Sequence, residues 1–472
     1  MFKKLLSDSL IYGLSGIVSS FVGIFLIPLY TRIFQPADYG VISMLTTTSA
    51  FLTILIIFSM DNSSAVWFWE KPSYEDRKTT FNTWLQFLGI FGFVIMLLVV
   101  LFSTSLSNLF FDTDKYKILF VLLGVNIWLA TFQKIVNVWC RMMEKPFLAI
   151  FYSSLITCTT VGFNLLFVLK QHLGVVGVFY SQLIASVIGI IMLLVFFKKW
   201  ISFSSFSLER LKEMFHFSLP LVPANLLYWV LNTTSVYFIK YFIHSNAEIG
   251  LYQVGASMAS ILSLITWAFF QAWTSFGLSV SKKPYAGKIY SLVLEIFCIF
   301  GMFVAFSLFL VSKDVLLIFA STKYVDAKYV IGIMAINVVL LGIPNILAIA
   351  NSLTKKNQSY AVAIGIGTAV TVLSFLLLIP RYGKEGAALS ILLGNLVVPV
   401  YLGLKAQKLY YIPYNFIKII LFVGLELLLF GISFFLFNAT WMHFVSIIAI
   451  GSLIVYMYFI MSKNKLALLK SE

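Results

Sequence analysis

Two basic residues at the ends of apolar stretches are the side chains of this chain best suited to chemistry. Arg32 follows the apolar stretch 10–30, and Lys240 lies near the end of the stretch 219–242. A guanidinium binds phosphate or carboxylate through two parallel N–H donors, whereas an ammonium is a mobile point charge. The pair therefore indicates an anion-binding site, with the alternative that both side chains only extend to the polar edge of a membrane.

Two further groups of polar residues would support the same chemistry. Lys134 and Arg141 are seven residues apart, about two turns of a helix, so they would form a basic patch on one face. Asn232, Thr233 and Thr234 form a polar run inside a long apolar stretch. Either these side chains contribute to ligand binding, or the basic pair only determines topology and the polar run only packs helices.

Acidic residues inside apolar stretches indicate a second kind of site, because an unpaired charge is expensive there. Glu295 lies about two turns into the stretch 289–311, where it would either bind a proton for coupling or serve only in packing. Asp61, at the inner end of the stretch 41–60, is expected to pair with a nearby cation during gating. We interpret Glu426 as a peripheral acid at a helix contact.

Motifs for enzymatic chemistry are not recognisable in the sequence. It has no glycine-rich loop followed by Lys and Ser/Thr for nucleotide phosphates, and its three cysteines show no zinc or disulfide pattern. A membrane enzyme that polymerises lipid-linked sugars would present a sizeable outer loop, whereas the longest outer connection covers only 312–329. We therefore expect no enzymatic activity, no cofactor and no bound metal.

The elements that position these residues are membrane helices. Hydrophobic residues make up 61% of the 472 residues and charged residues only 11%, and the mean hydropathy is +0.98. Because a spanning helix needs about 20 apolar residues, the sequence predicts an all-α polytopic membrane protein with fourteen transmembrane helices. The predicted spans are 10–30, 41–60, 85–106, 118–136, 147–169, 175–197, 219–242, 251–273, 289–311, 330–353, 360–379, 387–404, 416–437 and 444–461.

The distribution of basic residues predicts the orientation. The chain has 33 Lys and Arg against 18 Asp and Glu, and most of the basic residues fall on one side if the N-terminus is cytoplasmic. Since Lys and Arg are retained on the cytoplasmic side, we expect both termini in the cytoplasm. The net charge of +15 then reflects topology and anionic headgroups, and we expect no nucleic-acid partner.

An internal repeat predicts how the helices are grouped. Ala37-Asp38-Tyr39-Gly40-Val41 recurs 210 positions later as Ala247-Glu248-Ile249-Gly250-Leu251, and Gly174 and Gly177 recur 209 positions later as Gly383 and Gly386. Duplicated halves around a substrate path are typical of transporters. We predict two pseudo-symmetric six-helix lobes around a central cavity, residues 1–205 and 206–408, followed by helices 13 and 14 with a cytoplasmic tail in 409–472.

Motifs along most of the chain resemble one family of exporters. The sequence is similar to Wzx-type lipid-linked oligosaccharide flippases of the multidrug/oligosaccharidyl-lipid/polysaccharide exporter superfamily. The motifs that carry the resemblance are Ile27-Pro28-Leu29-Tyr30-Thr31-Arg32, Ala37-Asp38-Tyr39-Gly40, Met60-Asp61-Asn62-Ser63-Ser64-Ala65, Trp67-Phe68, Leu219-Pro220-Leu221-Val222-Pro223, Gly250-Leu251-Tyr252 and Gln271-Ala272-Trp273.

The resemblance implies a function and a set of partners. It implies a multi-pass protein of the bacterial cytoplasmic (inner) membrane that flips undecaprenyl-diphosphate-linked oligosaccharide units by alternating access, for polysaccharide, O-antigen or lipopolysaccharide biosynthesis. Arg32 and Lys240 would then bind the diphosphate near the outer opening. Membrane lipids, a polysaccharide polymerase and chain-length machinery are the implied partners.

Three alternatives stay open. The first is a multidrug exporter of the same superfamily, which would carry a buried acid in its first helix, whereas the stretch 10–30 has none. The second is a lipid II flippase. The third and most distant alternative is a membrane glycosyl polymerase.

Overall fold

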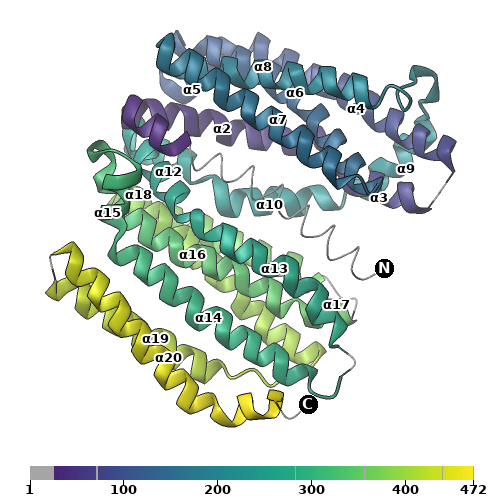
Figure 1. Ribbon diagram of the computed structural model, residues 1–472. Coiled ribbons are helices and arrows are strands. Elements are labelled where there is room, and N and C mark those ends of the chain that lie inside the picture. Colours follow the sequence, from purple (N-terminus) through teal and green to yellow (C-terminus); the bar gives the residue numbers. More distant parts are fainter. Residues whose placement is uncertain (1–25, 71–72, 282, 355–357, 438, 471–472) are drawn as a thin grey trace. The chain divides into compact units, whose positions relative to one another are not determined.

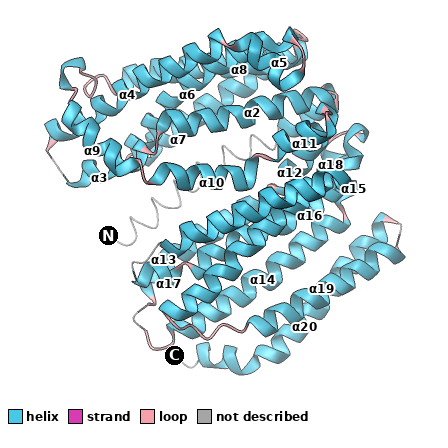
Figure 2. Ribbon diagram, turned by 180° about the vertical axis from the view of Figure 1, so that it is seen from behind, coloured by secondary structure: helices cyan, strands magenta, loops and turns pink. Residues whose placement is uncertain are grey.

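The structure is helical throughout the part of the chain that it describes. The computed structural model describes residues 26–70, 73–281, 283–354, 358–437 and 439–470, and these residues contain helices and turns but no strand (Figure 2). Eleven helices are long and apolar enough to cross a membrane, or twelve when one bent pair counts as a single span. The predicted all-α membrane class is confirmed.

The count of fourteen spans stays a prediction, and two features explain the lower number. The first predicted span, 10–30, lies mostly outside the described residues. Helix α18 (Gln358–Leu409) has 52 residues and contains two predicted spans, with non-helical φ and ψ angles of 52° and −127° at Gly383. A helix of this length is about 78 Å long, which is enough for two crossings of a hydrocarbon core of about 30 Å.

The chain divides into two compact units, Met1–Gly250 and Leu251–Glu472. The first unit is built around α6, which packs against α2, α4, α7 and α8 (Figure 1). Its helices are α2 (Pro36–Ile57), α3 (Met60–Glu70), α4 (Tyr74–Leu101), α5 (Ser103–Phe111), α6 (Lys117–Met142), α7 (Pro146–Asn164), α8 (Gly174–Phe196), α9 (Leu208–Ser218), α10 (Leu221–Thr233), α11 (Ser235–Ile243) and the start of α12 (Asn246–Ala259).

Local sequence accounts for the main breaks in this unit. Pro36 begins α2, where the absent N–H costs nothing, and the side chain of Ser73 caps α4 by accepting from the N–H of Asp76. One end of the unit holds an aromatic core in which Trp139 contacts Phe81 and Trp200 with ring centroids 5.0 and 5.4 Å apart. This core fixes α4, α6 and the segment after α8 relative to one another.

The second unit is built around α14 and α16. Helix α14 packs against α16 on one side and α19 on the other, while α16 also packs against α18 (Figure 1). The described helices are the rest of α12, α13 (Ile261–Ser279), α14 (Ala286–Leu310), α15 (Ser312–Phe319), α16 (Lys328–Leu347), α17 (Ile349–Thr354), α18, α19 (Phe416–Leu436) and α20 (Thr440–Lys470).

The unit boundary differs in position from the boundary that the repeat predicts. Helices α10 and α11 pack against α2, and α9 packs against α3 and α4, so residues 208–243 group with the first unit in space. The predicted lobe boundaries at 205 and 408 rest on the repeat and stay a prediction.

The repeated glycines have matching structural roles. Gly174 and Gly383 both have positive φ, 60° and 52°, a conformation that glycine adopts without steric cost. The second glycine of each pair lies close to backbone atoms: a Cβ on Gly177 would lie 3.3 Å from the carbonyl carbon of Phe167, and one on Gly386 would overlap the carbonyl group of Leu378. The repeat thus preserves one local turn geometry in both halves.

The other repeated motif brings its two copies together within the first unit. A Cβ on Gly40 would overlap the carbonyl oxygen of Asn246, and a Cβ on Gly250 would overlap the carbonyl oxygen of Pro36. Pro36 and Asn246 are themselves 210 positions apart, as Gly40 and Gly250 are. The start of α2 and the start of α12 therefore contact each other reciprocally, through equivalent residues.

Candidate functional site

Two of the predicted functional residues form an ion pair in the first unit. The Nζ atom of Lys134, on α6, lies 3.2 Å from Oδ2 of Asp61, which is in the first turn of α3. The two side chains are 41% and 22% exposed. A pair that water reaches contributes about 0–1 kcal/mol to stability, so Lys134 can exchange Asp61 for another anion at little cost. The role of this pair in gating stays a prediction.

Lys240 also has an acidic partner, which sequence analysis did not identify. Its Nζ atom lies 3.2 Å from Oδ2 of Asp112; the Lys240 side chain is 14% exposed and that of Asp112 is 77% exposed. Asp112 ends α5 in the left-handed conformation, with φ of 58°. An acid in the connection between two predicted spans was the available signal, but its distance of 128 residues from Lys240 gave no reason to pair them.

Arg32 is placed differently from Lys240. It lies on the surface near the end of the helical segment 26–33, and no ion pair joins it to another residue in the described part of the chain. Its guanidinium is therefore accessible to an anion, while the ammonium of Lys240 is held by Asp112. The structure shows no direct contact between Arg32 and Lys240 among the described contacts, and their shared role as a phosphate site stays a prediction.

The two ion pairs lie at opposite ends of the first unit. Asp112 precedes the start of α6 at Lys117, and Lys134 is 17 residues further along the same helix, about 25 Å by the rise of a helix. Arg141 is exposed in the last turn of α6, about two turns beyond Lys134. This arrangement places exchangeable positive charge at each end of a path about as long as a membrane is thick.

The polar run inside the seventh predicted span marks a break in a helix. Helix α10 ends at Thr233 and α11 begins at Ser235, so Thr234 lies between them. Thr234 Oγ1 donates to the carbonyl of Val230 at 2.8 Å, and Asn232 Nδ2 donates to the carbonyl of Tyr228 at 3.0 Å. These bonds satisfy polar groups within the helix, and the proposed ligand role of Asn232, Thr233 and Thr234 is a prediction that they leave untested.

A buried arginine is a structural feature that the sequence analysis missed. Arg210 on α9 is 6% exposed, and its guanidinium donates from Nη1 to Thr80 Oγ1 at 2.6 Å and from Nε to Glu213 at 3.1 Å. Trp67 Nε1 also donates to Glu213, at 2.9 Å. The network joins α9 to α3 and α4, so Arg210 holds this end of the unit together.

In the second unit, Glu295 has a basic partner. Its Oε2 atom lies 3.1 Å from Nζ of Lys418, and the side chains are 0% and 7% exposed. Ser291 donates to Oε1 of Glu295 at 3.4 Å, and the ammonium of Lys418 lies 4.4 Å from the centre of the Tyr458 ring. Glu295 is thus buried as part of a pair between α14 and α19. Its predicted coupling role stays a prediction.

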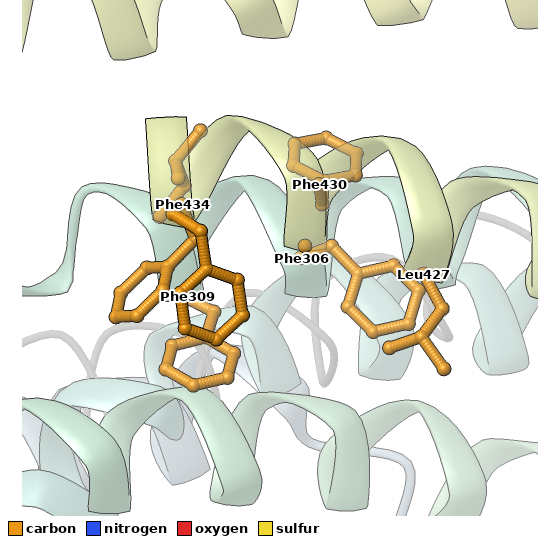
Figure 3. A pocket seen from close by; sticks show the side chains of 8 residues that line it. Phe306, Phe309, Leu427, Phe430 and Phe434 are labelled. Atoms are coloured by element: carbon orange, nitrogen blue, oxygen red, sulfur yellow. The ribbon is translucent and has the colours of Figure 1, made fainter. Parts of the chain in front are cut away.

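The second unit also contains an apolar pocket between α14 and α19. Its volume is about 210 Å³, and the side chains that line it are carbon only, as Figure 3 shows for Phe306, Phe309, Leu427, Phe430 and Phe434. A pocket of this lining offers nothing to a charged or sugar headgroup. It is therefore separate from the polar site of the first unit.

Comparison with solved structures defines the class of protein. The fold is similar to "Lipid II flippase MurJ, inward closed conformation", with a TM-score of 0.78 and 15% identity over 97% of this chain and 100% of that one. It is also similar to an inward-facing multidrug resistance MATE family transporter of the MOP superfamily, with a TM-score of 0.64 and 14% identity over 86% of this chain and 98% of that one. The Vibrio cholerae MATE transporter VcmN in the bent form gives 0.55 and 15%, over 90% and 98%.

The chain therefore has the fold of membrane flippases and transporters of this superfamily. Residues 29–327 match the family described as "Polysaccharide biosynthesis protein", and the chain belongs to that family. The family resemblance predicted from the motifs is confirmed at this level. A comparison with curated proteins gives no significant match.

Proposed function

We propose that this protein is a flippase that moves undecaprenyl-diphosphate-linked oligosaccharide units across the bacterial cytoplasmic membrane. The observation that carries the proposal is the match to the polysaccharide biosynthesis family over 29–327, a range that contains the ion pairs of the first unit and Glu295. The flippase-like fold over nearly the whole chain supports it. O-antigen and other surface polysaccharides are the products that such a cargo serves, with a polymerase and chain-length machinery as partners.

The charges of the first unit suit this cargo. Sugars and a diphosphate cannot enter hydrocarbon without replacing the hydrogen bonds that they make to water. Lys134, half-exposed beside Asp61, supplies a cation at one end of the unit, and Lys240 beside Asp112 supplies one at the other. In each pair the phosphate displaces a carboxylate from an ammonium, so the cation stays neutralised before and after the cargo passes.

The test is export of the glycan by variants of these cations. For Arg32→Ala, Lys240→Ala and the double variant we expect a tenfold or greater loss of export, because one charge-assisted hydrogen bond contributes about 1.5–3 kcal/mol. Removing Lys240 leaves only the exposed Asp112, so membrane abundance is expected to stay normal. Lys463→Ala, in the C-terminal tail, is the control. Normal export by the double variant at normal abundance contradicts the diphosphate role.

The alternatives predict different cargo. A lipid II flippase is favoured by the similarity to MurJ, and a multidrug exporter by the similarity to MATE transporters. Deleting the gene is expected to make a prenyl-linked glycan accumulate inside the cell. Rescue of cells depleted of their lipid II flippase would support the first alternative instead, and increased drug sensitivity without glycan accumulation would support the second.

A further inference from the structure

Helix α19 turns a single narrow face inward, and that face contains ionisable groups. Its buried residues are Lys418, Phe422, Glu426, Phe430 and Ser433, at spacings of four, four, four and three. The rest of the helix is apolar and largely exposed, as expected for contact with lipid. A helix that needed only to pack would have apolar side chains on this face too. The polar residues therefore call for a chemical explanation.

Glu426 is the most costly of these residues. Its side chain is 0% exposed, and neither carboxyl oxygen has a hydrogen-bond partner among the described residues. Phe422 and Phe430 lie one turn to either side, and Cys298 of α14 is within electrostatic reach. An isolated carboxylate is strongly disfavoured in such surroundings, whereas a protonated carboxyl is not. One proton thus separates the favourable from the unfavourable form.

The nearest opposite charge is already occupied. Lys418 lies two turns before Glu426 on the same helix, about 12 Å along its axis, and pairs with Glu295 at 3.1 Å. Helix α20 contributes Tyr458, beside Lys418, and His443, which is 9% exposed with a buried Nδ1 that has no partner within the described residues. These four groups and Cys298 are the ionisable side chains that the helices packed around α19 present.

The polar groups form a row between α14, α19 and α20. The Glu295–Lys418 pair lies near the start of α19, Glu426 lies near its middle, and Ser433 lies near its end. Because α20 runs back from the end of α19 and Lys418 contacts Tyr458, His443 lies toward the Ser433 end. Glu426 is therefore the single carboxyl midway between two polar ends, on helices that belong to one unit.

We propose that Glu426 is a proton-binding site of this transporter. In the state that the structure describes, the carboxyl holds its proton. When the contact between α14 and α19 opens to water, its O–H bond breaks and the proton passes to a water molecule, leaving a carboxylate that the opened contact solvates. The proposal names the ion that the protein binds and does not depend on which cargo it moves.

A proton fits this site better than a metal cation. Hard cations require several oxygen ligands, and the side chains that flank Glu426 on its own helix are phenylalanines. In the described part of the chain no group of three or more His, Cys, Asp and Glu side chains could hold a metal ion. A single carboxyl with apolar neighbours can bind a proton without further ligands.

The experiment reads the protonation of Glu426 directly. Full-length protein is reconstituted in lipid vesicles, and infrared difference spectra are recorded between acidic and alkaline buffer in the region of the carboxyl C=O stretch. We expect a pH-dependent band of a protonated carboxyl in the wild type and its loss in Glu426→Gln, an uncharged side chain of the same shape. Glu75→Gln, which changes an exposed acid of α4, is the matched control and should keep the band.

The remaining arms separate the outcomes. Glu426→Asp should keep a pH-dependent band at a shifted position, which tests the site even if the glutamine variant is poorly folded. A band that is identical in wild type and Glu426→Gln overturns the proposal, and so does a band that responds to Na⁺ at constant pH instead of to pH. Because no cargo is present, failure of the proposed glycan transport would leave these spectra unchanged.

Discussion

The contact between Gly40 and Gly250 allows a sharp test of packing in the first unit. An alanine at position 40 would place its Cβ onto the carbonyl oxygen of Asn246 and only 2.8 Å from the carbonyl carbon of that residue, with the Gly250 nitrogen 3.2 Å away. All three are backbone atoms, so no side chain can rotate aside. The change Gly40→Ala, or its repeat partner Gly250→Ala, must therefore push the starts of α2 and α12 apart.

The expected magnitude combines two opposing effects. Overpacking by one methyl group costs about 1–3 kcal/mol, and a clash with rigid backbone belongs at the upper end of that range. Replacing a helical glycine by alanine contributes about 1 kcal/mol in the other direction. The net destabilisation should be about 2 kcal/mol for either variant, and less than the sum for the double variant because both changes open the same contact.

The assay is thermal unfolding of the purified protein in detergent, with Gly162→Ala as the control. Gly162 also lies in a helix of the first unit, but a Cβ there would meet nothing within 4 Å. We expect a lower unfolding midpoint for Gly40→Ala and Gly250→Ala, and an unchanged or higher midpoint for the control. If the three single variants behave alike, or if the double variant is fully additive, the reciprocal contact is not what the glycines provide.

Three further predictions concern ion pairs and topology. Arg210→Met should lower the unfolding midpoint by the equivalent of about 1–3 kcal/mol, because the buried Thr80 hydroxyl loses its partner; an unchanged midpoint would contradict the structural role of Arg210. Glu295→Gln and Lys418→Met should each destabilise by about 3–5 kcal/mol, and the double variant by less than their sum, since one buried charge alone is worse than none; a thermal double-mutant cycle without coupling would refute the pair. A cysteine at Lys463, in protein lacking its natural cysteines, should react with impermeant reagents only from the cytoplasmic side, and labelling from outside alone would reverse the topology.

The membrane class and much of the helix layout could be predicted from the sequence. Spans are a local property, because about 20 consecutive apolar residues satisfy both the hydrocarbon and the backbone without help from distant residues. The repeat was equally local to detect. Its glycines recur because the backbone requires them: positive φ at Gly174 and Gly383, and close backbone approach at Gly40 and Gly250.

The partners of the charged residues were decided only by the tertiary structure. Sequence analysis identified Lys240 and Glu295 as candidates but not Asp112 and Lys418, which lie 128 and 123 residues away from them. Spacing along one helix indicates which side chains share a face, but not which helix packs against that face. A charge in a membrane helix is stabilised by whatever lies opposite it, and that is determined by the packing of helices far apart in the chain. For this reason Glu426 looked like a peripheral acid in the sequence and is a buried carboxyl in the fold.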